Sequence, residues 1–303
     1  MSGRPPPAAP PGVEQPLGSL DVDPNAARVV AVTKAARRAE RRIGAPWAWL
    51  VFVLGALYFI LPLVGTFLHS LRTRPDIFLA YRQVLDDPKF FGGLLYSFTV
   101  GVITIVVSLA IIVPTAYWVR LKVPRLRPVV EFVTLMPFVI PPVILVFGLI
   151  RIYSSRPLQL TAIPLGSDLM LVGAYVVLSF PYMYRAVDTG LAAMDVRSLT
   201  EAGQSLGSGW FRILWRVIFP NLRTALLSGA FLTLAIVIGE YTIAQFLGRT
   251  AAFGPYLSLL GRNAPYTPAA VSLISFGLTW LAMGLIAFLG RGRGTRVQVA
   301  GAR

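Results

Sequence analysis

Six long apolar runs dominate this sequence and limit what it can fold into. They cover residues 46–68, 95–118, 129–150, 169–187, 225–247 and 270–289. Each run is about 19–24 residues long, which matches the roughly 20 helical residues needed to cross about 30 Å of hydrocarbon. A membrane-spanning strand would need only about 9–11 residues of alternating polarity. The runs show no such alternation, so the sequence predicts an all-α, polytopic bundle of six transmembrane helices.

The composition excludes the main alternatives to a membrane protein. Hydrophobic residues make up 55% of the chain and charged residues only 14%, against about 25% charged in soluble domains. A soluble fold of this length could not bury so much apolar surface. The chain has no cysteine and a single histidine, His69, which excludes thiolate metal sites and iron–sulfur clusters and disfavours a histidine-based metal site. We therefore expect no cofactor.

The positions of the basic residues predict how the bundle lies in the membrane. The formal net charge of +15 is compatible with nucleic acid or with an anionic membrane surface. With both termini inside, 20 Lys and Arg residues fall on cytoplasmic segments and 8 on outer ones. This asymmetry follows the positive-inside rule, so it predicts an N-in/C-in orientation and explains the charge without nucleic acid. The cytoplasmic segments are then 1–45, 119–128, 185–224 and 290–303.

The first 44 residues differ in character from the rest. Residues 4–11 are rich in proline, which favours polyproline II or disorder. A basic stretch follows, with a short helix expected at 25–42. The charged region is too long for a signal peptide, and no cleavage site follows a short apolar core. We interpret residues 1–44 as a disordered basic cytoplasmic tail, and 291–303 as a cytoplasmic C-terminal tail.

The longest internal cytoplasmic segment, between the fourth and fifth spans, predicts a first short helix. Ser198 and Glu201 have the spacing of a capping box, so this helix is expected to start near Leu199. Four small or apolar residues at helical spacing form one face, and two glycines then end the helix. The face comprises Leu199, Ala202, Gly203 and Leu206, and the glycines are Gly207 and Gly209.

A second helix is expected from Trp210 to Phe219, and Pro220 should stop or kink it. The small residues of the first helix allow another surface to come close. Periodicity alone leaves two interpretations open. The first helix could dock onto a partner, or it could lie on the membrane interface.

The same segment resembles the coupling-loop signature of binding-protein-dependent ABC importer permeases. That pattern has Glu-Ala-Ala, three residues, Gly, nine residues, and then Ile-x-Leu-Pro. This chain has Glu201-Ala202-Gly203, then Gly207, then Val217-Ile218-Phe219-Pro220, with both spacings intact. Gly203 replaces the second alanine, while Val217 and Phe219 are conservative apolar replacements. The resemblance is to the type I, methionine/maltose-permease-like transmembrane domain, and is closest to the polyamine-type second permease group.

The resemblance implies partners and roles that the chain alone does not show. In the family, the coupling helix inserts into a cleft on a cytoplasmic ABC ATPase dimer. The pore is completed by a second permease subunit, in a hetero- or homodimer, and an extracytoplasmic substrate-binding protein delivers the solute. By carry-over, this chain would be a non-enzymatic permease in a bacterial or archaeal plasma or inner membrane. Its ATPase-coupling residues would be Glu201, Ala202, Gly203, Gly207 and Pro220.

The chain has no phosphate-binding loop of the Gly-x4-Gly-Lys-Ser/Thr type, so the energy must come from a partner. We expect residues 45–90 to form the first transmembrane helix and an outer loop. Residues 91–290 would form the permease domain, with its coupling loop at 195–222.

Glu240 is the most informative charged residue within the predicted spans. A carboxylate inside a membrane costs at least ~2.5 kcal/mol on insertion scales, so it should face the bundle interior or a watery path. It could meet a cationic substrate, pair with a basic residue of a partner subunit, or be protonated and hydrogen-bonded as a structural polar group. The Gly239-Glu240-Tyr241 run also resembles runs in polyamine, iron and oxyanion permeases. We assign Glu240 and Tyr241 to the substrate path and expect a polyamine, spermidine or putrescine, or a related small solute.

Two other classes of protein fit this sequence less well. A self-sufficient secondary transporter or channel would need coupling-ion sites and often carries inverted repeats. The sequence shows no such repeat and no deep charge besides Glu240. A polytopic membrane enzyme would need a metal site or a pair of intramembrane carboxylates, and the residues for neither are present.

Overall fold

The computed structural model describes residues 46–157 and 159–290. Within these ranges every regular element is helical. The predicted tails, 1–44 and 291–303, and the helix expected at 25–42 lie outside the described residues. The chain divides into two compact units, residues 1–63 and 64–303, and each is treated by itself. The first predicted span is helix α2, Pro46–Ser70, which carries apolar side chains on all sides, as a membrane helix does.

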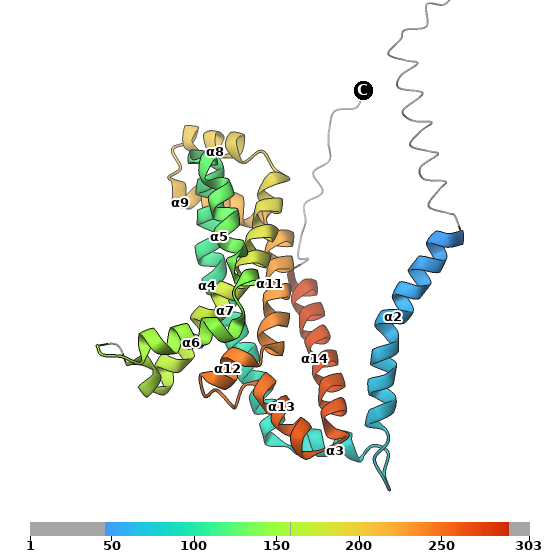
Figure 1. The fold of residues 1–303 in the computed structure, drawn as a ribbon. Coiled ribbons are helices and arrows are strands. Elements are labelled where there is room, and N and C mark those ends of the chain that lie inside the picture. The colour runs from blue at the N-terminus through green and yellow to red at the C-terminus, as the bar shows by residue number, and fades with distance from the viewer. Residues whose placement is uncertain (1–45, 158, 291–303) are drawn as a thin grey trace, which may run out of the picture. The chain divides into compact units, whose positions relative to one another are not determined.

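Three long helices pack side by side at the centre of the second unit (Figure 1). They are α4, Pro88–Lys122, α7, Pro164–Ala192, and α11, Arg223–Gly239. Helix α14, Thr267–Gly290, packs against α3, Leu79–Asp86, and also contacts α11. The contacts between these helices are mainly apolar, with a buried hydrogen bond of 2.7 Å between the hydroxyls of Ser108 and Ser179. The fully buried side chains include Tyr117, Leu171, Met183, Leu191 and Leu234.

The predicted spans 95–118, 169–187 and 270–289 are confirmed as parts of α4, α7 and α14. Each helix is longer than the apolar run that predicts it, because polar residues at its ends continue the same hydrogen-bonding pattern. By length and composition, four helices of the described residues are able to cross a membrane, or up to six if each of two bent pairs counts as one span. The predicted six spans are the upper value, and the N-in/C-in orientation stays a prediction.

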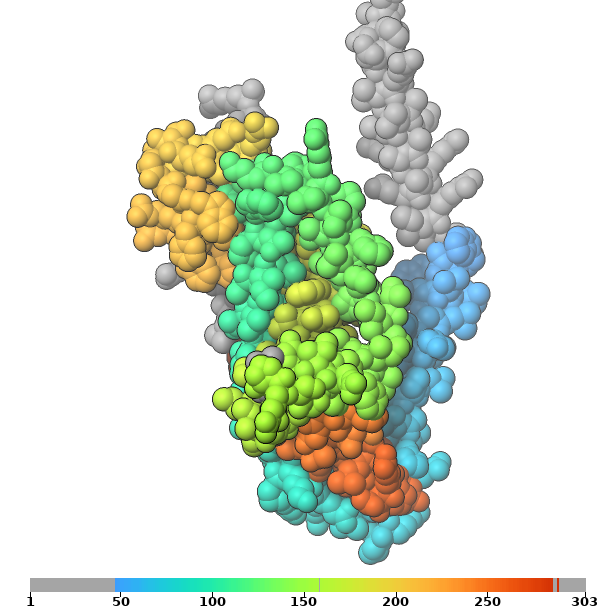
Figure 2. All heavy atoms as spheres, turned by 60° about the vertical axis from the view of Figure 1, so that its left-hand side comes forward, coloured from blue at the N-terminus to red at the C-terminus, as the bar shows by residue number. Residues whose placement is uncertain are grey.

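The third predicted span, 129–150, is not one straight helix. The chain forms α5, Arg127–Val139, and α6, Pro142–Tyr153, which meet at 98°. Pro141 and Pro142 cause the break, because proline has no N–H to donate and its ring clashes with the preceding turn. Helix α6 therefore turns away from α5 and lies beside α12, Thr242–Phe246 (Figure 2). The rings of Phe147 and Phe246 pack there with their centroids 4.9 Å apart.

The fifth predicted span, 225–247, is also interrupted. Helix α11 ends at Gly239, Glu240 takes an extended backbone conformation, and the short α12 follows from Thr242. Hydropathy misses this break because the residues on both sides remain apolar. At its other end, α11 is bent by 77° from the helical stretch Trp210–Asn221.

At the end of the bundle opposite helix α8, Val196–Ser205, hydrogen bonds join residues that are far apart in the sequence. Asp87 caps α4 by accepting a bond of 2.9 Å from the Lys89 N–H. The same carboxylate accepts a bond of 2.8 Å from the hydroxyl of Tyr256, on α13, Phe253–Asn263. Burial and this bond raise the pKa of Tyr256 above its ordinary value. Short 3-10 turns at Pro124–Leu126 and Leu160–Ala162 complete the connections.

Candidate functional site

The segment with the coupling-loop motif folds as two short helices at one end of the bundle (Figure 1). The first, α8, spans Val196–Ser205. Its N-cap is Asp195, whose carboxylate accepts bonds of 3.1 Å from the Ser198 N–H and 2.7 Å from the Ser198 hydroxyl. These bonds hold the pKa of the Asp195 carboxyl below its usual range.

The predicted capping box of Ser198 and Glu201 is therefore wrong. The helix starts three residues earlier than Leu199, because Asp195 is the stronger local acceptor. Glu201 does not reach back to the cap. Its carboxylate instead forms an i,i+4 ion pair of 2.8 Å with Arg197 on the exposed surface of α8.

The buried face of α8 also differs from the predicted one. Val196 and Thr200 are buried and Gly203 is partly buried, whereas Ala202 and Leu206 face outward. Leu206 is 86% exposed. Gly203 faces the second helix of the same segment, where an added Cβ would lie 2.9 Å from Cγ1 of Ile213. Its small size thus serves a close contact within this chain.

Gly207 ends α8, as predicted. Its φ of +75° lies in the left-handed region, which glycine enters without steric cost. The Gly207 N–H donates to the Gln204 carbonyl at 2.9 Å, and the Ser208 N–H donates to the Gly203 carbonyl at 3.0 Å. These bonds satisfy carbonyls at the helix end and reverse the chain into the second helix.

The second helix runs through Trp210–Asn221, close to the predicted 210–219, and contains a π-helical turn at Leu214–Ile218. Pro220 lies within its last turn, and the bend onto α11 comes two residues later, at the buried Leu222. Proline is tolerated there because its missing N–H falls at the start of the α-helical turn that follows the π turn. The segment presents exposed apolar side chains at Leu206, Phe211 and Trp215.

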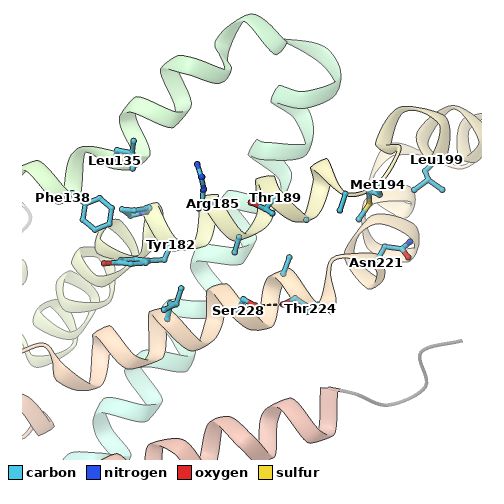
Figure 3. A pocket seen from close by; sticks show the side chains of 16 residues that line it. Leu135, Phe138, Tyr182, Arg185, Thr189, Met194, Leu199, Asn221, Thr224 and Ser228 are labelled. Carbon is cyan, nitrogen blue, oxygen red and sulfur yellow. Dashed lines mark hydrogen bonds between the residues drawn. The ribbon is translucent and has the colours of Figure 1, made fainter. Parts of the chain in front are cut away.

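A groove of about 1030 Å³ runs from this segment along the bundle (Figure 3). It lies between α5, α7 and α11 and reaches Leu199 on α8. Arg185 lines it and forms no ion pair within the part of the chain that the structure describes. The other residues that line this groove are uncharged. They include Thr224 and Ser228, and the Ser228 hydroxyl donates a hydrogen bond of 3.0 Å to the Thr224 carbonyl. We call this space the inner groove.

A second groove, of about 630 Å³, continues from the inner one. Both helix breaks line it, from Pro137 to Pro142 on one side and from Gly239 to Thr242 on the other. We call it the break groove. Phe138 and Tyr182 line both grooves. Their rings meet edge to face, with centroids 5.4 Å apart (Figure 3), so this pair marks the junction between the two spaces.

The break groove contains both residues predicted for the substrate path, Glu240 and Tyr241. The Glu240 carboxylate accepts bonds of 2.9 Å from the Ile243 N–H and 3.2 Å from the Ala244 N–H, at the start of α12. It also accepts a 3.0 Å bond from the hydroxyl of Tyr175 on α7. Glu240 therefore holds the break in place as a hydrogen-bonded structural group, while its protonation and its roles toward a substrate or a partner subunit stay predictions.

An ion-pair network, defined here as the Asp188 network, joins three helices beside the inner groove. Asp188 on α7 accepts from Arg120 of α4 at 3.2 Å and from Arg127 of α5 at 2.8 Å. Arg127 also pairs with Glu131 at 2.9 Å, one helical turn further along α5. Asp188 was not among the residues predicted from the sequence, since it lies just beyond the predicted span 169–187; its one local signal is its place one turn from Arg185.

Nothing in the described ranges suggests a metal centre, since no group of three or more His, Cys, Asp or Glu side chains gathers there. Residues 108–293 match the family described as binding-protein-dependent transport system inner membrane component. The chain belongs to this family. It is therefore a permease subunit of an ABC importer, a multi-pass protein of the inner membrane. In this family ATP hydrolysis is performed by a partner, so the permease is not itself an enzyme.

Relatives of the permease are named for different substrates. A probable molybdenum ABC transporter permease protein of Haloferax volcanii is 30% identical over 189 residues, which cover 60% of this chain and 70% of the relative. A spermidine/putrescine transport system permease protein of Haemophilus influenzae is 24% identical over 271 residues, 80% of this chain and 89% of the relative. A probable sulfate permease of Chlorokybus atmophyticus is 28% identical over 202 residues, 64% of this chain and 69% of the relative.

A solved structure confirms the fold of the permease. It is the crystal structure of a bacterial ABC transporter involved in the import of the acidic polysaccharide alginate. The match has a TM-score of 0.58 and 21% identity, and it covers 83% of this chain and 97% of the other. Membership of the importer family leaves the hypotheses of a secondary transporter and of a membrane enzyme without support.

Proposed function

We propose that α8 is the element through which a partner ATPase drives this permease. The observation that carries the proposal is the placement of α8 at the end of the bundle, with Glu201 and Ala202 on its exposed face (Figure 1). A helix held on one side by its own chain and open on the other suits insertion into a partner's cleft. The matching family signature occupies the same residues.

The coupling residues divide into two kinds in this proposal. Glu201 and Ala202 would contact the ATPase directly. Gly203, Gly207 and Pro220 would shape the segment. Gly203 allows the second helix to approach, Gly207 reverses the chain, and Pro220 lies beside the bend into α11. A push on α8 would then reach α11 through the second helix, Trp210–Asn221, which packs on α8 at Gly203 and leads into α11.

The partners that this function needs are an ABC ATPase dimer, a second permease subunit and an extracytoplasmic substrate-binding protein. Both grooves lie on the surface of this single chain, which is what half of a shared pathway would present. The second permease, identical or different, would close them. The binding protein would dock at the opposite end of the bundle from α8.

For the cargo we propose a polyamine of the spermidine or putrescine type. The support is the spermidine/putrescine permease of Haemophilus influenzae, which aligns with 80% of this chain and over 89% of its own length. Uptake of labelled spermidine by vesicles containing the reconstituted importer tests this. Competition by putrescine supports the assignment, whereas transport of sulfate or molybdate in place of spermidine would replace it with an oxyanion.

The coupling proposal is tested by co-purification with the ATPase and second permease encoded beside this chain. We expect the wild type to retain an ATPase pair, and Ala202→Arg or Gly207→Asp to lose it. Glu201→Ala should weaken retention. The matched control is Asn263→Arg, which adds the same charge at an exposed position on α13. Retention by Ala202→Arg equal to that of the control, or transport without any ATPase, would overturn the proposal.

A further inference from the structure

The two helix breaks face the same space, although about 100 residues separate them in the sequence. The α5–α6 break and the α11–α12 break both line the break groove, and α7 contributes Leu178 and Tyr182 between them. Irregular backbone within a membrane is tolerated only where it is buried in protein or lines a watery cavity. Two breaks that converge on one groove therefore indicate a built site rather than two unrelated kinks.

The α5–α6 break supplies hydrogen-bond acceptors to this groove. In an unbroken helix the carbonyls of Pro137 and Phe138 would accept from the N–H groups of residues 141 and 142. Both of those residues are prolines and have no N–H. The two carbonyls are thus left without their helical donors, at residues that line the groove.

The α11–α12 break is fixed by close packing as well as by hydrogen bonds. An added Cβ at Gly254, on α13, would overlap the backbone carbonyl of Glu240. Only glycine permits this approach. Together with the bonds from Tyr175, Ile243 and Ala244, it holds the Glu240 carboxylate at the wall of the groove instead of leaving it free to swing.

The chemistry of the lining selects for one sign of charge. Glu240 is the only charged side chain among the residues that line the break groove, and no Lys, Arg or His joins it there. Its other polar groups include the unpartnered carbonyls, and three aromatic rings accompany them, those of Phe138, Tyr182 and Tyr241. Carboxylate, carbonyl oxygens and aromatic faces all attract an organic ammonium group.

We propose that the break groove is a binding station for an organic ammonium group on its way through the permease. This inference rests on the proposed function and deepens it, because it places the cation of the cargo at Glu240 and the free carbonyls. The inner groove beyond the Phe138–Tyr182 pair carries Arg185 instead. A cation is attracted to the first space and repelled from the second, so it does not rest near the exit.

The absence of cysteine from the whole sequence gives this inference a direct test. Ala235→Cys places a thiol in the break groove, and Ser228→Cys places one in the inner groove. The two positions are seven residues apart on α11, so they share a helix face. Each variant, assembled in the full importer complex in lipid vesicles, is treated with cationic aminoethyl or anionic sulfonatoethyl methanethiosulfonate, and the rates of labelling are compared.

We expect the ratio of cationic to anionic labelling to be at least ~10-fold higher at Ala235→Cys than at Ser228→Cys, as one nearby unit charge of each sign would give. Adding Glu240→Gln, which keeps an acceptor for the Ile243 N–H, should remove most of this preference. Adding Tyr175→Phe, which loosens the carboxylate but keeps its charge, should leave most of it. Spermidine should slow labelling at Ala235→Cys, and sulfate should not.

Equal ratios at the two positions, a ratio unchanged by Glu240→Gln, or protection by sulfate and not by spermidine would each overturn the inference. The labelling needs no ATP turnover. Failure of the coupling proposal would appear as an ATPase pair retained by Ala202→Arg, whereas failure of this inference would appear only in the labelling ratios of an intact wild-type complex.

Discussion

The hydroxyl of Tyr117 on α4 lies 2.9 Å from the hydroxyl of Thr200 on α8. Thr200 donates its own proton to the Val196 carbonyl at 2.7 Å, so Tyr117 is the donor in the bond between the two. Both residues are buried, Tyr117 completely. This bond ties the helix proposed to receive the ATPase to the longest helix of the bundle, and it gives α8 a fixed point against which a push can act.

Tyr117→Phe should therefore weaken coupling while the complex still assembles. The ring remains to fill its buried site, and one hydrogen bond is lost, at a cost of about 1 kcal/mol. We expect less substrate transported per ATP hydrolysed in proteoliposomes, with normal ATPase retention. Trp118→Phe, at an exposed neighbouring position, is the control. An unchanged transport-to-hydrolysis ratio in Tyr117→Phe would show that the bond is only structural.

Asp195→Ala should destabilise α8 and reduce ATPase retention, because it removes the side chain that accepts from Ser198. Asp195→Asn keeps an acceptor and should retain most of the binding. The native pKa of Asp195 lies below its ordinary value of 3.8, so its contribution is complete above that value and is lost as the pH falls through the lower native pKa. Retention measured between pH 6 and pH 8 should thus be constant in the wild type. A change linked to Asp195 in that range would contradict this assignment.

Gly203→Ala should be destabilising even though the family signature has alanine at this position. The new Cβ would lie 2.9 Å from Cγ1 of Ile213, and overpacking of this kind costs about 1–3 kcal/mol. Ile213→Ala alone leaves a cavity and costs about 2–5 kcal/mol. The double variant should be more stable than the sum of the two predicts, since each change relieves the other. Strict additivity in thermal unfolding of the purified complex would argue against the contact.

Asp188→Asn should loosen α4, α5 and α7 together at the end of the bundle that carries α8. The amide keeps the shape of the side chain but loses the charge that holds Arg120 and Arg127. Because Arg127 is half exposed, we expect a loss of only about 1 kcal/mol. The change should appear as faster protease cleavage in residues 119–128, and Glu131→Gln should have a smaller effect. Equal cleavage rates in wild type and Asp188→Asn would mean that packing alone holds this end.

Much of the architecture can be predicted from the sequence because it is encoded locally. Long apolar runs identify α4, α7 and α14, since the length needed to cross a bilayer and the need to satisfy backbone hydrogen bonds leave few alternatives. The coupling motif is equally local, with both of its spacings contained in residues 201–220. Gly207 also follows from local rules, because a left-handed turn after a short helix requires glycine.

Other features depend on which distant residues meet. Gly203 was expected to face a partner, but Ile213 occupies that side, and only the packing of the two short helices decides this. Likewise, the Asp188 network joins three helices whose contact no local pattern reveals. Side-chain periodicity describes one helix at a time and does not say which neighbour it packs against.

The sequence by itself determined that this chain is an all-helical membrane protein with the coupling motif of an importer permease. Those properties follow from hydropathy, spacing and short-range backbone chemistry. Only the tertiary structure decided that Glu240 ends a helix and caps the next one, and that its break faces the proline break of α5 and α6. The position of Glu240 depends on its contacts with Tyr175 on α7 and with Gly254 on α13, and a hydropathy profile does not describe contacts between helices.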